Sequence, residues 1–281
     1  MTDGKIIKED RDSPGKPQLY IIKIGGNIID DEPKLAAFLK DFAQIKGHKI
    51  LVHGGGKMAT SFAEKLNIPQ QVQNGRRITD AETLKLVTMV YAGLINKSIV
   101  ATLQANSCNA FGLCGADGNV ISAHKRNRSS TIGEAGIDYG FVGDVDSVNH
   151  DLLQSLLSNQ LTLVIAPVTH DLNGQLLNTN ADTIAKEVAI ALSTLNDVSL
   201  VYSFEKKGVL SNPADETSVI KNIDAGNYSK LKNTGAISAG MIPKLDNAFN
   251  ALHAGVERVI IGDAMEIHQL IKREAGTIIT T

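Results

Sequence analysis

Two apolar runs of the chain each end in a cluster of glycines, a pattern suited to binding anions. The first is Lys23-Ile24-Gly25-Gly26-Asn27 and the second is Val52-His53-Gly54-Gly55-Gly56. Glycine has no side chain to keep an anion away from backbone N–H groups, and a helix that follows adds the positive end of its dipole. Tight packing of a strand against a helix would explain one such turn equally well. Two turns at the same edge of a parallel sheet indicate a ligand site.

Two lysines are candidates for the cations that face this anion. Lys23 interrupts an apolar run, where an ammonium group is costly unless it is paired. Lys244, in Gly240-Met241-Ile242-Pro243-Lys244, lies near an expected helix start, where the helix dipole disfavours a cation until an anion is bound. Each lysine could instead reach water through its long aliphatic stem.

A third segment, Asn178-Thr179-Asn180-Ala181-Asp182, places two amides and a carboxylate at the start of another expected helix. Asn and Asp are common helix caps. Because a cap uses only one side chain, the other two polar groups are available to face a ligand.

The glycine clusters alone leave the class of nucleotide open. No stretch of the sequence fits the P-loop pattern, and the catalytic signatures of protein kinases are absent from it. Gly54-x-Gly56-x-x-Ala59 formally matches the dinucleotide fingerprint, but Arg76 and Arg77 stand where its acidic residue is expected. Arginine there would suit a 2′-phosphate, so an NADP-binding oxidoreductase is an alternative.

The alternation of apolar runs and helical patterns predicts an α/β fold, a three-layer α/β/α sandwich with a mostly parallel open sheet. We expect residues 1–18 to form a flexible tail and residues 19–281 to form one domain with two lobes, 19–185 and 186–281. The expected strands are Leu19–Ile24, Lys49–Val52, Leu161–Val168, Val198–Ser203 and Val259–Ile261.

A long helix is predicted from Ala81 to Gln104, with Thr79 and Glu82 as a capping box at its start. Its apolar residues form one continuous stripe. The stripe fits either packing within the chain or an interface between subunits, and periodicity does not separate the two.

The composition excludes several kinds of partner. The net charge is −2, and aromatic residues make up 4% of the chain, with no Trp. No long-range field therefore draws the chain to nucleic acid or to an anionic membrane. The charged N-terminus lacks a secretory apolar core, Leu161–Val168 is too short to span a membrane, and Cys108 and Cys114 lack zinc-ligand spacing. We expect a cytoplasmic protein without protein ligands for a metal.

These motifs, together with Asn74-Gly75-Arg76-Arg77-Ile78-Thr79, resemble the amino acid kinase family, and within it the members that phosphorylate N-acetylglutamate. The resemblance extends from about Leu19 to Thr281. It implies ATP-dependent phosphorylation of the γ-carboxylate of N-acetyl-L-glutamate, a step of arginine biosynthesis. The N-lobe would bind the acylated amino acid and form a homodimer. The C-lobe would bind ATP, whose phosphates would hold Mg²⁺.

The resemblance also implies roles for individual residues. Lys23 and Lys244 would stabilise the phosphoryl group during its transfer, and Asp182 would orient both lysines. The residues implied for substrate binding are Gly55, Gly56, Arg77, Asn178 and Asn180. Those implied for phosphate and ATP binding are Gly25, Gly26, Asn27, Gly54, Ser203, Gly208 and Met241.

The chemistry of this reaction agrees with the residue types. A carboxylate with an ordinary pKa of about 4.3 is ionised at neutral pH, so the nucleophile needs no general base. Catalysis must then come from positioning and from positive charge. Arginine suits the substrate α-carboxylate because its fork of N–H groups matches two carboxylate oxygens.

The sequence departs from the family pattern in three places, of which two bear on the site. Phe204-Glu205-Lys206-Lys207-Gly208 is longer than the usual turn and lacks its Asp, and Arg76 replaces an apolar or aromatic residue. Arg76 is expected either to point to solvent or to meet a second carboxylate, such as that of N-succinyl-L-glutamate. A third hypothesis, a binding protein without activity, should have lost a catalytic charge, yet Lys23, Asp182 and Lys244 are all present.

Overall fold

The computed structural model describes residues 15–73, 76–127, 136–212, 214–235, 237 and 241–280, and for Arg76 it describes the backbone. Most of the predicted tail, the motif residues Asn74, Gly75 and Gly240, and the side chain of Arg76 lie outside these ranges.

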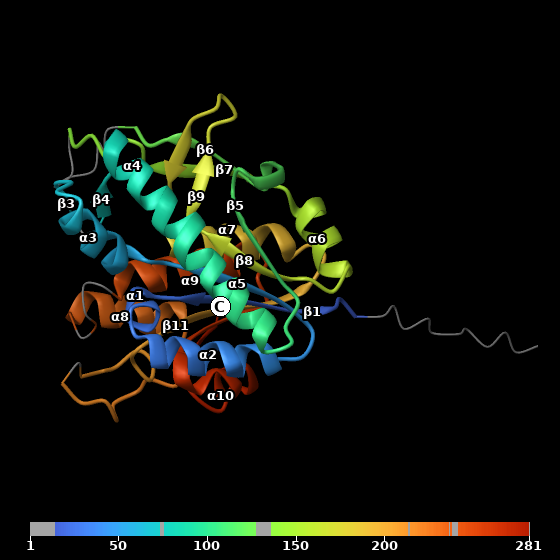
Figure 1. The fold of residues 1–281 in the computed structure, drawn as a ribbon. Helices are drawn as coiled ribbons and strands as arrows, with labels where there is room; N and C mark the ends of the chain where they lie inside the picture. The colour runs from blue at the N-terminus through green and yellow to red at the C-terminus, as the bar shows by residue number, and fades with distance from the viewer. Residues whose placement is uncertain are drawn as a thin grey trace, which may run out of the picture.

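An eight-stranded sheet forms the centre of the molecule (Figure 1). Its strand order is β12-β14-β13-β11-β1-β2-β8-β5, and every neighbouring pair is parallel except β13 and β14. The predicted mostly parallel open sheet is therefore confirmed. The strands are β1 (Gln18–Ile24), β2 (His48–His53), β5 (Ala110–Cys114), β8 (Thr162–Ala166), β11 (Asp197–Phe204), β12 (Asn222–Ile223), β13 (Arg258–Asp263) and β14 (Thr277–Ile279).

Alternation along the buried strands directs apolar side chains to both faces of this sheet. On β1, Leu19 and Ile21 belong to one core, and Ile22 and Ile24 belong to the other. The first core is covered by α6 (His150–Ser158), α7 (Ala181–Leu192), α8 (Ala225–Thr234) and α9 (Ile242–His253). The second is covered by α1 (Gly26–Ile29), α2 (Glu32–Gln44), α3 (Gly56–Lys65), α10 (Ile267–Lys272) and the long helix. The sheet and its two helical layers form the predicted sandwich.

Two smaller sheets extend the carboxyl edge of the central sheet. The chain leaves β8 through Pro167 and enters the sheet β10-β9-β6-β7. A separate hairpin pairs β3 with β4. The strands are β3 (Gln71–Gln73), β4 (Arg76–Ile78), β6 (Ile121–Lys125), β7 (Gly143–Val148), β9 (Val168–His170) and β10 (Leu176–Asn178), and two 3₁₀ turns cover Asp117–Asn119 and Ala264–Glu266.

The predicted long helix exists, but its middle is not α-helical. It consists of α4 (Ala81–Val87), a π-helical segment η1 (Thr88–Ile95) and α5 (Asn96–Ala105). Figure 1 shows it crossing the whole molecule. By length and composition this helix could span a membrane, but 44% of its most apolar window is buried within the chain, where α5 packs on β5 and α2.

The predicted capping box at the start of this helix is wrong. Asp80 is the N-cap, and its carboxylate accepts a hydrogen bond of 2.8 Å from the backbone N–H of Thr83. The hydroxyl of Thr79 is used elsewhere, because it donates to the carbonyl of Arg77 and accepts from Asn178. The cap therefore comes from Asp80, and Thr79 instead joins the helix start to the distant residue Asn178.

The expected lobes share the central sheet. Strand β1 lies between β2, from the first predicted lobe, and β11, from the second. The predicted boundary at residues 185 and 186 falls inside α7 (Ala181–Leu192). The division into an N-lobe and a C-lobe stays a prediction.

Candidate active site

Both glycine turns open at the carboxyl edge of the central sheet. Ile24, the last residue of β1, is paired with His53 on β2 and with Ser203 on β11. The N–H of Gly54 donates to the carbonyl of Ile24 at 3.1 Å, which ties the second turn to the end of the first strand. The backbone N–H groups of the two turns therefore converge on one region.

The second turn requires glycine at its centre. Gly55 has a φ of +151°, which only glycine adopts readily. A Cβ at this position would lie 2.3 Å from Cδ1 of Ile95 and 3.0 Å from the ring of Tyr91, both on the π-helical segment. The long helix thus packs directly against the backbone of the turn.

The helices behind the two turns differ in length. Gly25 leads into α1, which has four residues, whereas Gly55 caps α3, which has ten. Because the helix dipole grows with the number of aligned peptide units, the second turn has the stronger positive field.

Lys23, Asp182 and Lys244 meet at this edge of the sheet. Alternation places Lys23 on the β1 face that packs on α7 and α9, and these two helices supply Asp182 and Lys244 from their first turns. Nζ of Lys23 forms an ion pair of 2.7 Å with Oδ1 of Asp182, and Nζ of Lys244 donates a hydrogen bond of 2.8 Å to Oδ2. One carboxylate therefore holds two ammonium groups from different elements.

The cluster is mostly shielded from solvent, since the side chains of Lys23, Asp182 and Lys244 are 12%, 16% and 23% exposed. Burial by itself would raise the pKa of Asp182. The charges of Lys23 and Lys244 outweigh burial and hold that pKa well below its usual range. The carboxylate is ionised, and with two ammonium groups the cluster has a net positive charge.

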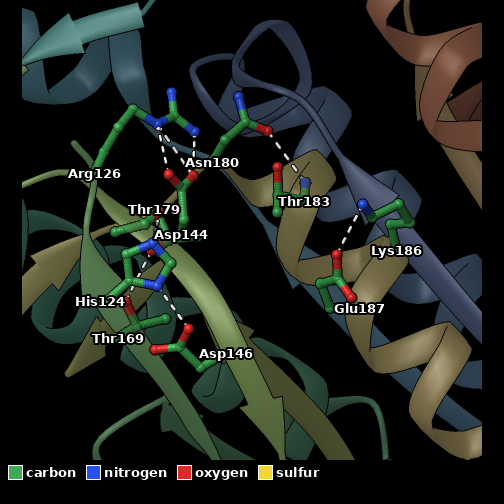
Figure 2. Close-up of polar contacts among 11 residues, drawn as sticks. His124, Arg126, Asp144, Asp146, Thr169, Thr179, Asn180, Thr183, Lys186 and Glu187 are labelled. Atoms are coloured by element: carbon green, nitrogen blue, oxygen red, sulfur yellow. Dashed lines mark hydrogen bonds and ion pairs between the residues drawn. The ribbon is translucent and has the colours of Figure 1, made fainter. Parts of the chain in front are cut away.

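The polar segment before α7 divides its functions among three residues. Asn180 is the N-cap, and its Oδ1 accepts from the backbone N–H of Asp182 at 2.8 Å and from that of Thr183 at 3.3 Å. Figure 2 shows the contact with Thr183. The side chain of Asp182 is thereby left to the lysines. Nδ2 of Asn178 donates to the hydroxyl of Thr79 at 3.0 Å, which joins β10 to the end of the β3–β4 hairpin.

Arg77 reaches the second glycine turn from β4. Its guanidinium donates to the carbonyl of Gly56 and the hydroxyl of Thr60, each at 2.8 Å, and to the side-chain oxygen of Gln70. All three acceptors are neutral, so they orient the guanidinium without cancelling its charge. The arrangement is suited to a ligand carboxylate.

Most of the predicted site residues line one cavity of about 290 Å³. Those lining it are Lys23, Gly25, Gly26, Gly54, Gly55, Gly56, Arg77, Asn178, Asn180 and Asp182. Lys244 reaches this group through Asp182. The volume of the cavity suits a small polar molecule that extends from Arg77 to the two lysines.

Four of the residues predicted for phosphate and ATP binding lie outside this cavity, whereas Gly25, Gly26 and Gly54 line it. Ser203 is buried at the end of β11, and Met241 is the N-cap of α9. Asn27 accepts a hydrogen bond from Lys57 in the first turn of α3. Gly208 packs so closely against β14 that a Cβ would lie 2.7 Å from Oγ1 of Thr277. The structure therefore gives Gly208 a packing function, and ATP binding by these residues stays a prediction.

Several residues of the cavity were not predicted from the sequence. Arg126, at the end of β6, lines the cavity beside Asn180 and forms a bidentate ion pair with Asp144 on β7 (Figure 2). Tyr91 lines it from the long helix. No local motif marks these positions, because strand pairing and helix packing bring them to the site. The others are Val72, Val142, Gly143, Pro167, Thr179, Ala181 and Thr183.

A buried histidine also supports the second turn. His53 has no solvent exposure, and burial lowers its pKa from 6.5 to about 4, with the nearby charge of Lys97 acting in the same direction. Between these two pH values the unfolded chain therefore binds a proton that the folded chain excludes. The free energy of unfolding should fall as the pH falls through this range.

We expect His53→Gln to remove this dependence. The unfolding free energy of the wild type should drop by about 3 kcal/mol more than that of the variant between pH 6.5 and pH 4. Urea titrations of both proteins across this range measure the difference, and groups shared by the two cancel. Parallel curves would show that His53 is protonated in the folded protein as readily as in the unfolded one.

An open α/β sheet whose carboxyl edge carries glycine turns and a carboxylate-bridged pair of lysines defines a phosphotransferase without a P-loop. Residues 18–263 match the model of the amino acid kinase family. The chain belongs to the amino acid kinase family, which confirms the predicted fold and family.

Known relatives agree with this assignment. The chain is 58% identical to the acetylglutamate kinase of Cytophaga hutchinsonii over 254 residues, which cover 90% of this chain and 94% of that protein. It is 54% identical to the acetylglutamate kinase of Bacteroides fragilis over 253 residues, which cover 90% and 95%. A crystal structure from Streptococcus mutans aligns with a TM-score of 0.75 at 28% identity and covers 93% of this chain and 98% of that one.

Replacing Arg77 by alanine should raise the KM for the acylated amino acid by about tenfold to a hundredfold, with a smaller change in kcat. The reason is the loss of a charge-assisted pair with a carboxylate, worth about 1.5–3 kcal/mol. Initial rates over a range of acetylglutamate concentrations measure both constants. Thr60→Ala is the matched control, because it removes a neutral partner of the guanidinium and keeps its charge. An unchanged KM in Arg77→Ala would remove this residue from the substrate site.

Proposed function

We propose that this chain phosphorylates the γ-carboxylate of N-acetyl-L-glutamate with ATP, the acetylglutamate kinase reaction of arginine biosynthesis. The observation that carries the proposal is the cavity that joins Arg77 to the pair of lysines on Asp182. A substrate with two carboxylates can place one on the arginine and the other beside the lysines. Two relatives that are 58% and 54% identical to this chain are acetylglutamate kinases. Membership of a kinase family argues against the NADP-binding alternative.

In this reaction an oxygen of the γ-carboxylate attacks the terminal phosphorus of ATP. The bond from that phosphorus to the bridging oxygen of ADP breaks, and ADP leaves. The carboxylate is ionised at neutral pH, so the protein has no proton to remove. The main barrier is the repulsion between two anions. Lys23, Lys244 and the backbone N–H groups of the glycine turns oppose that repulsion with positive charge. Asp182 keeps the two ammonium groups in place.

Magnesium fits this scheme as part of the nucleotide substrate. Among the residues that the structure describes, no group of three or more His, Cys, Asp or Glu side chains is placed to hold a metal ion. The only carboxylate in the lysine cluster, that of Asp182, is already paired twice. We propose that Mg²⁺ enters on the ATP phosphates, where it would add positive charge to that of the lysines.

A coupled ADP-release assay tests the proposal. Acetylglutamate, succinylglutamate, free glutamate and aspartate are compared at equal concentrations. We expect acetylglutamate to give the highest kcat/KM and free glutamate or aspartate to give little turnover. No ADP release with any acylated glutamate would overturn the proposed reaction.

N-succinyl-L-glutamate is the alternative substrate, and Arg76 is the residue that would select it. It stands next to Arg77, and a carboxylate at the far end of a succinyl group would be a partner for its charge. We expect that if N-succinyl-L-glutamate is used, Arg76→Leu lowers its kcat/KM by about tenfold and leaves that of acetylglutamate nearly unchanged. An unmoved ratio of the two values would exclude Arg76 from acyl selection.

We propose that the chain acts as a soluble cytoplasmic homodimer with no nucleic-acid or membrane partner. Met89 and Leu94 on the π-helical segment are 58% and 45% exposed, and a second copy of the long helix would cover them. Light scattering should give twice the mass of the chain. A monomer, or a stable hexamer, would contradict a dimer formed through this helix alone.

A further inference from the structure

The side chain of His53 connects the second glycine turn to the long helix. Its Nδ1 lies 2.8 Å from the carbonyl oxygen of Gly54, and its Nε2 lies 3.3 Å from Nδ2 of Asn96. Asn96 is the first residue of α5, and like His53 it has no solvent exposure. Two fully buried polar side chains thus join a turn of the active site to the helix behind it.

These contacts assign the protonation state of the imidazole. A carbonyl oxygen only accepts hydrogen bonds, so Nδ1 must donate to Gly54 and must hold the proton. Nε2 then accepts from the amide of Asn96, whose other N–H donates to the carbonyl of Val164 at 3.0 Å. The Oδ1 of Asn96 accepts from Lys97, so every polar group of the pair has a partner. His53 is therefore the neutral Nδ1–H tautomer.

The close packing around Asn96 gives its amide little freedom. A Cβ at position 112, where the chain has glycine, would lie 2.2 Å from Oδ1 of Asn96. Lys97 donates both to this oxygen and to the carbonyl of Gly112, each at 3.0 Å. The amide that supports His53 is thus fixed by both the helix and the neighbouring strand β5.

A hydrogen bond to the Gly54 carbonyl also sets the direction of the next N–H group. In a trans peptide the C=O of Gly54 and the N–H of Gly55 lie in one plane and point in opposite directions. His53 draws the carbonyl toward the buried side of the turn. The N–H of Gly55 is then directed away from His53, and Gly55 lines the substrate cavity. The N–H of Gly54 is held by its hydrogen bond to Ile24, and Gly56 is held within the first turn of α3. Gly55 lies between them, so the orientation of its N–H depends most on the contact of His53 with the Gly54 carbonyl.

We infer that His53 is a positioning residue for phosphoryl transfer: through the Gly54 carbonyl, and backed by Asn96, it aims the N–H of Gly55 at the reacting group. This inference rests on the proposed kinase reaction. His53 itself touches neither the substrate cavity nor the lysine cluster. If this N–H donor points in another direction, the enzyme should lose more stabilisation of the transition state than of the bound substrate.

Two substitutions separate the two contacts of His53. His53→Asn keeps a donor near the position of Nδ1 and loses the acceptor for Asn96. His53→Gln keeps an acceptor near the position of Nε2 and loses the donor to Gly54. We expect His53→Gln to lower kcat by about tenfold to a hundredfold with KM changed by less than about threefold, and His53→Asn to keep kcat within about threefold of the wild type.

Thr162→Val is the matched control for lost stability. Thr162 is a buried polar residue of the same sheet, where it accepts a hydrogen bond from Cys108 at the edge opposite the site. The Thr162→Val variant should have a lower free energy of unfolding than the wild type and an unchanged kcat. Equal losses of kcat in His53→Gln and His53→Asn, or a wild-type kcat in His53→Gln, would overturn the inference. Reduced kcat in Thr162→Val to the same degree would do so as well.

Nitrogen NMR of the wild-type protein gives a test that needs neither a variant nor turnover. Long-range ¹H–¹⁵N spectra should show His53 protonated on Nδ1, and the Gly55 amide signal should move when acetylglutamate is added. Protonation on Nε2 would exclude the bond to Gly54 and end the inference. If the wild type does not turn over acetylglutamate, the proposed reaction is wrong. The measured tautomer would still show whether His53 donates a hydrogen bond to the carbonyl of Gly54.

Discussion

Lys23→Ala and Lys244→Ala should each lower kcat by about two to three orders of magnitude, with much smaller changes in the KM for acetylglutamate and ATP. Each lysine supplies a positive charge that acts most strongly on the phosphoryl group in transfer, when it is bound fully to neither oxygen. Both ammonium groups are mostly buried, at 12% and 23% exposure, so solvent screens their charge little. Steady-state kinetics with each substrate varied in turn measure the effect.

Lys186→Ala is the matched control for the loss of a lysine. Lys186 lies on α7, the helix that carries Asp182, and it forms an ion pair of 2.8 Å with Glu187 (Figure 2). It does not line the cavity, so its removal should leave kcat unchanged. A rise in KM with an intact kcat in Lys23→Ala or Lys244→Ala would contradict the assigned role and make these lysines part of ground-state binding only.

Asp182→Asn should have an effect of similar size on kcat, about a hundredfold. Asparagine has nearly the same shape as aspartate but no charge, so the two ammonium groups would lose the carboxylate that holds them at 2.7 and 2.8 Å. They would then repel one another and turn toward other partners. Removing one member of a buried ion pair also destabilises a protein, here by about 3 kcal/mol.

Kinetics and unfolding together decide this prediction. kcat is measured at a temperature where the variant is folded, as judged by circular dichroism, and urea titration gives the loss in unfolding free energy. A variant that is less stable but turns over at the wild-type rate would limit Asp182 to a structural role at the start of α7. A variant with normal stability and low kcat would assign the residue wholly to alignment of the lysines.

The core of the site could be predicted from the sequence because local rules control it. Alternation along β1 places Lys23 on the face that packs on α7 and α9, so an ammonium group in an apolar strand already indicated a partner on that side. The segment before α7 had more polar groups than a cap requires, and Asn180 is the one that caps. Glycines at the ends of two parallel strands meet because strand direction puts both ends at one edge.

The rest of the site depends on contacts between distant segments. His53 and Asn96 are 43 positions apart, and nothing in the apolar sequence around either one marks a pairing. Arg126 and Asp144 come together only when β6 and β7 pair. The helix start at Ala81 was predicted correctly, but the capping box was not: Asp80 is the cap, and Asn178, 99 positions away, donates to the hydroxyl of Thr79.

The π-helical segment gives the long helix one residue more than an α-helix would hold in the same turn. A π turn holds about one residue more than an α turn, so deleting one residue from Thr88–Ile95 would let the helix return to α geometry with α4 and α5 still nearly in phase. Asn96 would then stay beside His53. The side chains inside the segment would be redistributed, among them Tyr91, which packs on the turn at Gly55. We therefore expect such a deletion to act on the wall of the cavity and to leave the support of the turn by His53 in place.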